Sequence, residues 1–355
     1  MFRKFSIIAI TGLFLSLCIF QFPHTLLAHE NYVLTAEQME TGMTDWSINV
    51  WDAAKNPENL AIGLKVGAGI FLAFLIYFFL LVSRFERFLD RTLGRFESWG
   101  GVLVRIALGF SFIYSAMTSV YLGPEIPITS LPLGFIIQWL LYIVGALLLL
   151  GFLSEIAGII SFIIICLATF VYKDYMITYF NYFGEFIAIA FFGSRFFSVD
   201  KLIWGVKKSV EKLQEWENLI VRVAYGISVL YPAFTIKILH PIIMIEIVEK
   251  YRLNEITWLF PSDPLLISLG TGLAQILVGI CIIIGFETRL TSLATFALYV
   301  MSIVYFKEVV WPHYILLALS LYFVINGGGK YTVDTWIKEK WSRWQMQRHS
   351  NRGIA

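Results

Sequence analysis

Two copies of one apolar unit constrain this chain more than any other feature of its sequence. Residues 104–109 (VRIALG) return as residues 221–226 (VRVAYG), a shift of 117 residues. Residues 150–152 (LGF) return as residues 284–286 (IGF), at a shift of 134 residues. The second shift also relates Lys173 to Lys307, Gly193 to Gly327, and residues 198–200 (SVD) to residues 332–334 (TVD). The chain therefore carries a tandem repeat, whose second copy has about 17 additional residues in its first loop.

Apolar stretches long enough to span a lipid bilayer occupy most of the chain. Hydrophobic residues make up 58% of the sequence and charged residues only 15%, which is far from the composition of soluble domains. A stretch of about 18 apolar residues can cross the hydrocarbon core, and it must do so as a helix because no water satisfies its backbone there. Nine such stretches follow the N-terminus, near residues 61–83, 102–121, 133–151, 155–172, 178–194, 219–239, 265–285, 289–306 and 311–326. We expect an all-α integral membrane protein with about nine transmembrane helices.

The N-terminus has the features of a secretory signal peptide. Two basic residues precede an apolar run that Pro23 interrupts shortly before Ala28, which predicts a signal peptide over residues 1–28. The bulky Leu26 is a poor residue close to a cleavage site, so retention of this segment as a tenth helix stays open. Either outcome places residue 29 onward outside the cytoplasm.

The distribution of Lys and Arg predicts the orientation in a prokaryotic plasma membrane. Basic residues concentrate in segments 84–99 and 194–217 and in the tail from residue 327, whereas loops 122–132, 173–177 and 307–310 contain few. This bias predicts an outside N-terminus and a cytoplasmic C-terminus. Each copy then holds four helices, so the two copies enter from the same side as parallel repeats, preceded by one extra helix.

These observations divide the chain into seven segments. They are a signal peptide (1–28), an extracytoplasmic segment (29–60), an extra transmembrane helix with a basic cytoplasmic loop (61–100), the first repeat (101–200), a basic amphipathic linker (201–217), the second repeat (218–336) and a basic cytoplasmic tail (337–355). Anionic lipid headgroups explain the basic, Trp-containing linker better than nucleic acid does. The lipid bilayer is therefore the expected partner of this linker.

The repeat resembles the DoxX family of membrane proteins over residues 100–200 and 218–336. Residues 273–279 (LAQILVG) run into residues 285–290 (GFETRL), and each copy ends in a Ser/Thr-hydrophobic-Asp signature. Gln275, which we predict with Tyr182 to be a ligand-binding residue, stands where the family often has Glu. Ser154-Glu155 stands where the family tends to have Thr-Arg. We predict structural roles for the two aspartates that close the copies, Asp200 and Asp334.

The resemblance implies an association with redox chemistry. The DoxX family includes proteins linked to quinone-dependent thiosulfate oxidation and to membrane oxidoreductase complexes. It therefore implies a quinone as the cofactor to expect, and a redox partner outside or within the membrane. Because a fold does not establish a function, each candidate residue needs its own argument.

Two arginines begin the repeats, and two interpretations of them stay open. Arg105 and Arg222 could each bind an anionic or carbonyl group, such as a quinone oxygen. Alternatively they could be structural, extending to the interface or pairing with Glu155 and Glu287. Glu155 of the first copy aligns with Arg289 of the second. An acidic residue in one copy is thus a basic residue in the other, which favours a structural role for the arginines, as a clamp between segments of the chain.

Glu185 is the strongest candidate for function. It lies near the middle of a predicted helix, where an ionised carboxylate is costly, so it is expected to carry a proton or to face water. Tyr182 lies three residues earlier, on the same helical face. A structural role, hydrogen-bonded to neighbouring helices, is equally compatible with this position. The equivalent residue in the second copy is Leu319, so any site here is asymmetric.

Metal and thiol chemistry have little support in the sequence. His29, His240 and His313 all fall on the predicted outer side and could converge on copper, but no spacing requires it. Cys166 and Cys281 are single residues in apolar helices, which excludes a CxxC redox relay.

Three function classes follow. The first is a quinone-binding or electron-passing membrane subunit of an oxidoreductase, and not a complete enzyme. The second is a small-solute or ion transporter with a path between the two repeats near Glu185. The third is an assembly or scaffolding factor, for which the outer segment 29–60 would be a docking arm. We predict the first.

Overall fold

Helices account for every regular element of the computed structural model, which describes residues 34–193, 197–205, 214–305 and 311–352. Over these ranges no β-strand is present. The predicted signal peptide (1–28) and His29 lie outside the described residues, as do residues 206–213 of the basic linker. The predicted all-helical fold is confirmed.

Several helices have the length and composition of membrane spans. Five are long and apolar enough to cross a bilayer: α3 (Pro57–Leu81), the run Phe85–Thr118, the run Ser154–Ile177, the run Trp216–Leu239 and α13 (Pro264–Ile284). Four apolar helices are shorter: α6 (Gly134–Leu150), α8 (Phe180–Phe192), α14 (Thr288–Tyr305) and α15 (Trp311–Asn326). These helices are compatible with a multi-pass membrane protein.

The three longer runs are each built from consecutive helices. They contain α4 (Arg84–Leu93), η3 (Gly94–Phe96) and α5 (Glu97–Thr118), then α7 (Ser154–Tyr172) and η5 (Lys173–Ile177), then α11 (Gln214–Pro232) and the π-helix η6 (Ala233–Leu239). The remaining elements are α2 (Ala36–Thr44), η2 (Val50–Lys55), η4 (Ile128–Ser130), α9 (Val199–Trp204), α12 (Pro241–Lys250), η7 (Leu253–Glu255) and α16 (Val333–Arg352). Basic segment 84–99, predicted as a loop, is largely helical, because its apolar and charged residues alternate with helical spacing.

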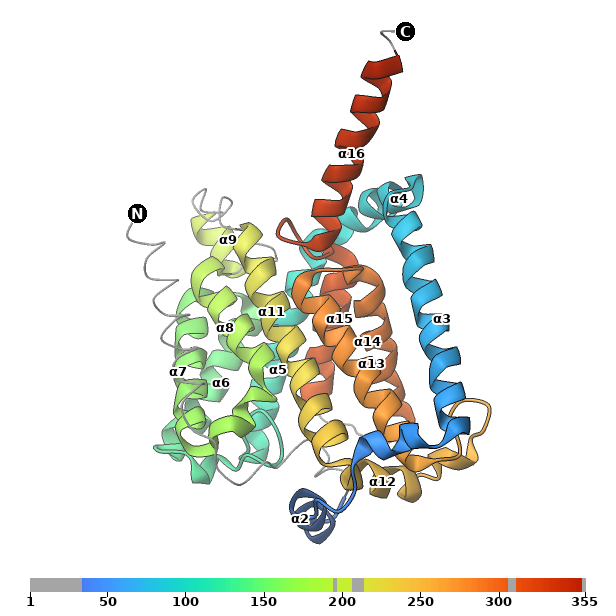
Figure 1. Cartoon of the computed structure of the whole chain (residues 1–355). Helices are drawn as coiled ribbons and strands as arrows, with labels where there is room; N and C mark the ends of the chain where they lie inside the picture. The colour runs from blue at the N-terminus through green and yellow to red at the C-terminus, as the bar shows by residue number, and fades with distance from the viewer. Residues whose placement is uncertain (1–33, 194–196, 206–213, 306–310, 353–355) are drawn as a thin grey trace.

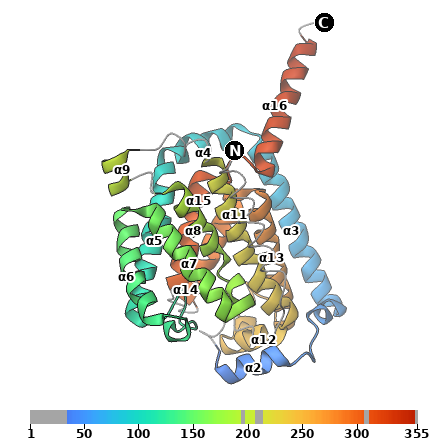
Figure 2. The same ribbon diagram turned by 90° about the vertical axis from the view of Figure 1, so that its left-hand side faces the viewer.

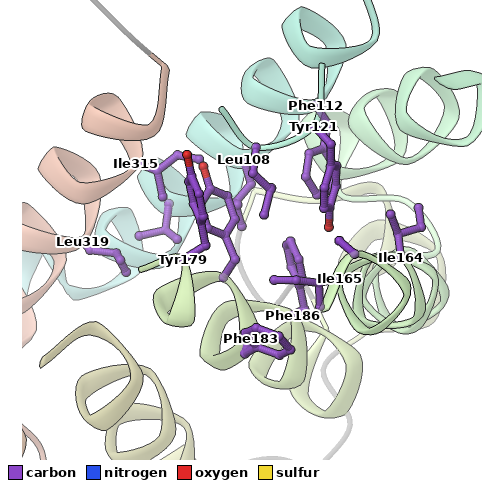
Figure 3. Packing of buried hydrophobic residues seen from close by; sticks show 14 of the residues in the cluster. Leu108, Phe112, Tyr121, Ile164, Ile165, Tyr179, Phe183, Phe186, Ile315 and Leu319 are labelled. Carbon is purple, nitrogen blue, oxygen red and sulfur yellow. The ribbon is translucent and has the colours of Figure 1, made fainter. Parts of the chain in front are cut away.

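Four helices form the centre of the bundle. α5 packs against α15, and α8 packs against α11. Outside this centre, α6 and α7 flank α5 and α8, while α13 and α14 flank α11 and α15 (Figures 1 and 2). Aromatic side chains fill the core between α5 and α8, where the Phe112 and Phe186 rings are 5.5 Å apart (Figure 3).

Glycine pairs bring helices into close contact in both halves. A Cβ atom on Gly109 would lie 2.9 Å from the carbonyl oxygen of Gly145, and one on Gly226 would lie 2.9 Å from that of Gly279. Gly226 and Gly279 are the repeat equivalents of Gly109 and Gly145. Small residues permit such backbone contact between apolar helices, so any larger residue would separate α5 from α6, or α11 from α13.

The two aspartates of the repeat signature make the same hydrogen bonds in each half. Asp200 accepts from the backbone N–H groups of Leu153 and Ser154, at 2.8 and 2.9 Å. Asp334 accepts from those of Glu287 and Thr288, at 2.7 and 3.1 Å. Each carboxylate thereby caps the N-terminus of a helix, α7 or α14, whose first N–H groups have no partner within the helix.

The N-terminal segment covers one end of the bundle. α2 packs against α12, with Met39 buried beside Ile243 and Met244, and η2 packs against α13. Trp46 contacts the ring of His240 with ring centroids 4.4 Å apart. The described part of segment 29–60, predicted as a docking arm, therefore contacts its own chain.

The opposite end carries α4 and α16, and α16 projects from the bundle (Figure 1). An ion-pair network holds these elements together. Arg289 on α14 contacts Glu86 and Asp90 on α4, both at 2.7 Å, and Lys338 on α16 contacts Glu86 at 2.9 Å. Glu86 and Arg289 are nearly buried, so the network joins α3 and α4 to the second half.

Candidate functional site

A buried carboxyl group lies at the centre of the bundle. Glu185 on α8 is only 2% exposed. Asn181, one helical turn earlier, donates a hydrogen bond from its side-chain amide to Glu185 Oε1 at 3.0 Å. Oε2 has no hydrogen-bond partner among the residues that the structure describes. A carboxylate in this environment would leave a charged oxygen unsatisfied, so the protonated form is favoured.

Glu185 lines a polar pocket between the two halves. The pocket has a volume of about 100 Å³ and is formed by side chains of α5, α8, α11 and α15. Its polar lining consists of Glu97, Arg105, Glu185, Glu217, Asn218, Tyr322 and Asn326. Leu319, the repeat equivalent of Glu185, also lines it, so the pocket has a carboxyl group at this position in one half and an apolar side chain in the other.

The pocket lies toward the end of the bundle that carries α16. Gly193 ends α8 and Asn326 ends α15, and both residues line the pocket. Its volume is enough for several water molecules. Binding sites for small organic molecules usually have roughly 300–1,000 Å³, so the pocket suits water, a proton or a small ion.

Both repeat arginines donate hydrogen bonds to backbone carbonyl groups in the segment after the last helix of their own half. Arg105 donates to the carbonyl oxygen of Phe197 at 2.7 Å. Arg222 donates to those of Gly328 and Tyr331, both at 2.6 Å. Arg105 also lines the pocket. Arg222 is only 1% exposed, and its hydrogen bonds to Gly328 and Tyr331 suit a structural clamp.

The expected pairing of Arg222 with Glu287 is absent from the described part of the chain. Glu287 is fully buried between α13 and α14, and neither of its carboxylate oxygens has a hydrogen-bond partner among the described residues. Its backbone φ of 50° is left-handed, an unusual conformation for this residue type. Glu155, the expected partner of Arg105, approaches the position of Gly193 at the end of α8.

Glu287 gives a prediction about pH. Burial raises the pKa of its carboxyl group to about 8, and the Asp334 carboxylate adds to the rise. The unfolded chain has a glutamate pKa of about 4.3, so the folded state binds the extra proton between these values. The free energy of unfolding should therefore fall as the pH rises through this window, by at most about 1.4 kcal/mol per unit.

Replacing Glu287 by Gln should flatten this dependence and stabilise the protein at high pH relative to the wild type. Thermal unfolding in detergent between about pH 6 and about pH 9 measures both effects. Glu155→Gln, at the aligned end of the first half, serves as the comparison. Parallel pH profiles for wild type and Glu287→Gln would contradict the prediction.

A polar contact between two half-buried side chains was not predicted from the sequence. Lys237 in the π-helix η6 donates a hydrogen bond to Gln275 Oε1 at 2.9 Å, and Gln275 donates to the carbonyl oxygen of Val229 at 3.0 Å. Gln275 therefore lies away from the Glu185 pocket. The signal available in the sequence was a lysine inside the apolar stretch 219–239, five residues after Pro232. π-Helical turns are frequent at functional sites.

The histidines do not form a metal site in the described ranges. No group of three or more His, Cys, Asp or Glu residues close enough for a metal occurs there. His240 lies under α2, against Trp46, whereas His313 lies on α15 beside Tyr299. Neither Cys166 nor Cys281 forms a disulfide bond within the described residues.

Comparisons with family models, with curated proteins and with solved structures found no match to this chain. The geometry of the pocket and its residues therefore carries the functional argument.

Proposed function

We propose that the chain is a multi-pass protein of the prokaryotic plasma membrane with nine spans, built from two parallel four-helix repeats of the DoxX type. The equivalent glycine contacts and equivalent aspartate caps of the two halves support the repeat. The basic residues of α4 and α16 lie at one end of the bundle, which supports a cytoplasmic position for that end. The α2 end is then outside.

The function that the geometry supports best is the transfer of a proton, or transport of a small ion or solute coupled to it, through the pocket between the repeats. The observation that carries this proposal is Glu185, a buried carboxyl group at a polar pocket inside an apolar bundle. Ionisable residues inside membrane helices are costly, and they typically mark proton or ion paths. Arg105 and Tyr322 supply further polar groups along the pocket.

A second candidate is the proton-handling membrane subunit of a quinone-linked oxidoreductase. The DoxX resemblance favours it, and quinol oxidation releases protons that need an acceptor. The pocket, at about 100 Å³, suits protons and water better than a quinone ring. In this role Glu185 would accept protons, and the quinone and a redox partner would bind elsewhere. A scaffolding role has less support, because the described part of the outer segment packs on its own chain.

Reconstitution into liposomes tests the first candidate. Vesicles with an internal pH-sensitive dye and an imposed potassium diffusion potential should take up protons faster with the protein than without it. Equal rates in protein-free vesicles would reject proton transfer.

Gentle purification from native membranes, followed by mass spectrometry of bound lipids and co-eluting proteins, separates the two candidates. Stoichiometric quinone together with a redox protein would favour the oxidoreductase subunit. Purified protein that moves protons without either component would favour the carrier.

A further inference from the structure

A line of polar side chains extends from Glu185 toward the opposite end of the bundle. Glu125 lies in the loop between α5 and α6, at the end that carries α2. Tyr175 donates a hydrogen bond to Glu125 Oε1 at 2.5 Å, and Tyr179 donates to the same oxygen. Both tyrosines are nearly fully buried, whereas Glu125 is half-buried. Glu125 is therefore a carboxylate at the bundle end, bonded to phenols inside it.

Helical spacing continues this line along α8. Tyr179, Tyr182 and Glu185 are three residues apart, so successive side chains lie on neighbouring turns of one face. The Tyr179 and Tyr182 rings are 6.0 Å apart, with centroids as end points. Along α8, Tyr182 stands between Tyr179, which bonds Glu125, and Glu185, about one turn from each. It is thus placed between the two carboxyl groups.

Buried hydroxyl groups gather around the middle of the line. Five side chains there, on α5, on the loop after it and on α8, have a buried oxygen with no hydrogen-bond partner among the described residues: Ser111, Ser115, Tyr121, Tyr182 and Glu185. The Tyr182 hydroxyl lies near that of Ser111 without hydrogen-bond geometry. Tyr121 and Tyr179 enter the same aromatic core (Figure 3). Each unsatisfied hydroxyl costs about 1–3 kcal/mol, which a core kept only for stability would avoid by using Phe or Ala.

The second repeat lacks this line. The positions equivalent to Tyr182 and Glu185 are Leu316 and Leu319, both buried. The position equivalent to Tyr179 is His313, which lies beside Tyr299. Since the two halves share their glycine contacts and caps but not these residues, the polar line is not needed to build the fold.

We infer that Glu125, Tyr179 and Tyr182 form a proton relay from the α2 end of the bundle to Glu185. This inference rests on the proposed proton transfer through the pocket. Glu125 first takes up a proton from the α2 side. A phenol donates one proton while accepting another, so Glu125 then passes its proton to Tyr179 as Tyr182 passes one to ionised Glu185, and Glu125 returns to the carboxylate. Water bridges the gaps that exceed hydrogen-bond distance. No bond between heavy atoms changes and no electron moves.

Tyr182→Phe tests the relay in liposomes that contain the full-length protein. Proton uptake should fall at least about tenfold, the scale of a lost proton-transfer group. The Tyr182 hydroxyl makes no hydrogen bond within the described structure, so its removal should leave thermal stability at least as high as that of the wild type. Tyr225→Phe is the matched control, because this buried tyrosine of the second repeat bonds Ser320 instead, and its uptake should equal that of the wild type.

A second measurement distinguishes loss of the relay from loss of the Glu185 pocket. Infrared difference spectra that record the Glu185 carboxyl group should still show its titration from the pocket side in Tyr182→Phe. Wild-type uptake in Tyr182→Phe, combined with loss in Glu185→Gln, would overturn the relay and leave the proposed function standing. Uptake in the wild type no faster than in protein-free vesicles would overturn both.

Discussion

Replacing Glu185 by Gln should reduce proton uptake into liposomes by about 100-fold or more, close to the rate of protein-free vesicles. Glutamine matches glutamate in size and keeps a carbonyl oxygen that can accept the hydrogen bond from Asn181. It cannot bind and release a proton at accessible pH. The substitution therefore removes only the ability to bind and release a proton, which the proposed function requires.

The Glu185→Gln variant should lose proton uptake while keeping the stability of the wild type. Because the carboxyl group is buried and favours its neutral form, a neutral amide should leave the free energy of unfolding within about 1 kcal/mol of the wild type. Glu287→Gln is the matched control, since it removes another buried carboxyl group at a place that does not line the pocket. Its proton uptake should be that of the wild type. Undiminished uptake in a folded Glu185→Gln protein would reject Glu185 as the proton carrier.

The sequence predicted the helices well because the information is local. Apolar length needs no knowledge of helix rotation, and the recurrence of residues along the chain was visible directly. The same holds for Glu185, since a carboxylate inside an apolar stretch is unusual in itself. Its hydrogen-bond partner was not predicted: Asn181, four residues earlier, bonds the carboxyl group, whereas the sequence spacing indicated Tyr182 as the neighbour on that face.

Contacts between distant segments could not be predicted in this way. Arg222 binds backbone carbonyl groups, which every residue possesses and which therefore leave no signature in a sequence. Gln275 faces Lys237 because the π-helix after Pro232 changes the direction of the side chains that follow. The pocket is lined by residues of four helices, α5, α8, α11 and α15. Its first and last polar residues, Glu97 and Asn326, are more than 200 positions apart in the sequence.

The second large effect concerns stability. Arg222→Met should lower the free energy of unfolding by about 3–5 kcal/mol. The guanidinium group is buried and its two hydrogen bonds, at 2.6 Å, hold the segment between α15 and α16. Methionine fills part of the space but leaves both carbonyl groups without their donor. That segment precedes Asp334, which caps α14, so the loss should extend to the start of that helix.

Thermal unfolding in detergent measures this loss, and Arg222→Lys is the graded comparison. Lysine keeps the charge but offers a single ammonium group, so it cannot reproduce the planar fork that reaches two carbonyl groups. We therefore expect an intermediate stability for Arg222→Lys. If Arg222→Met unfolded at the wild-type temperature, the clamp would be ruled out. The binding role left open by the sequence would then be the better explanation for a buried arginine at this position, because a ligand-binding side chain contributes little to the stability of the free protein.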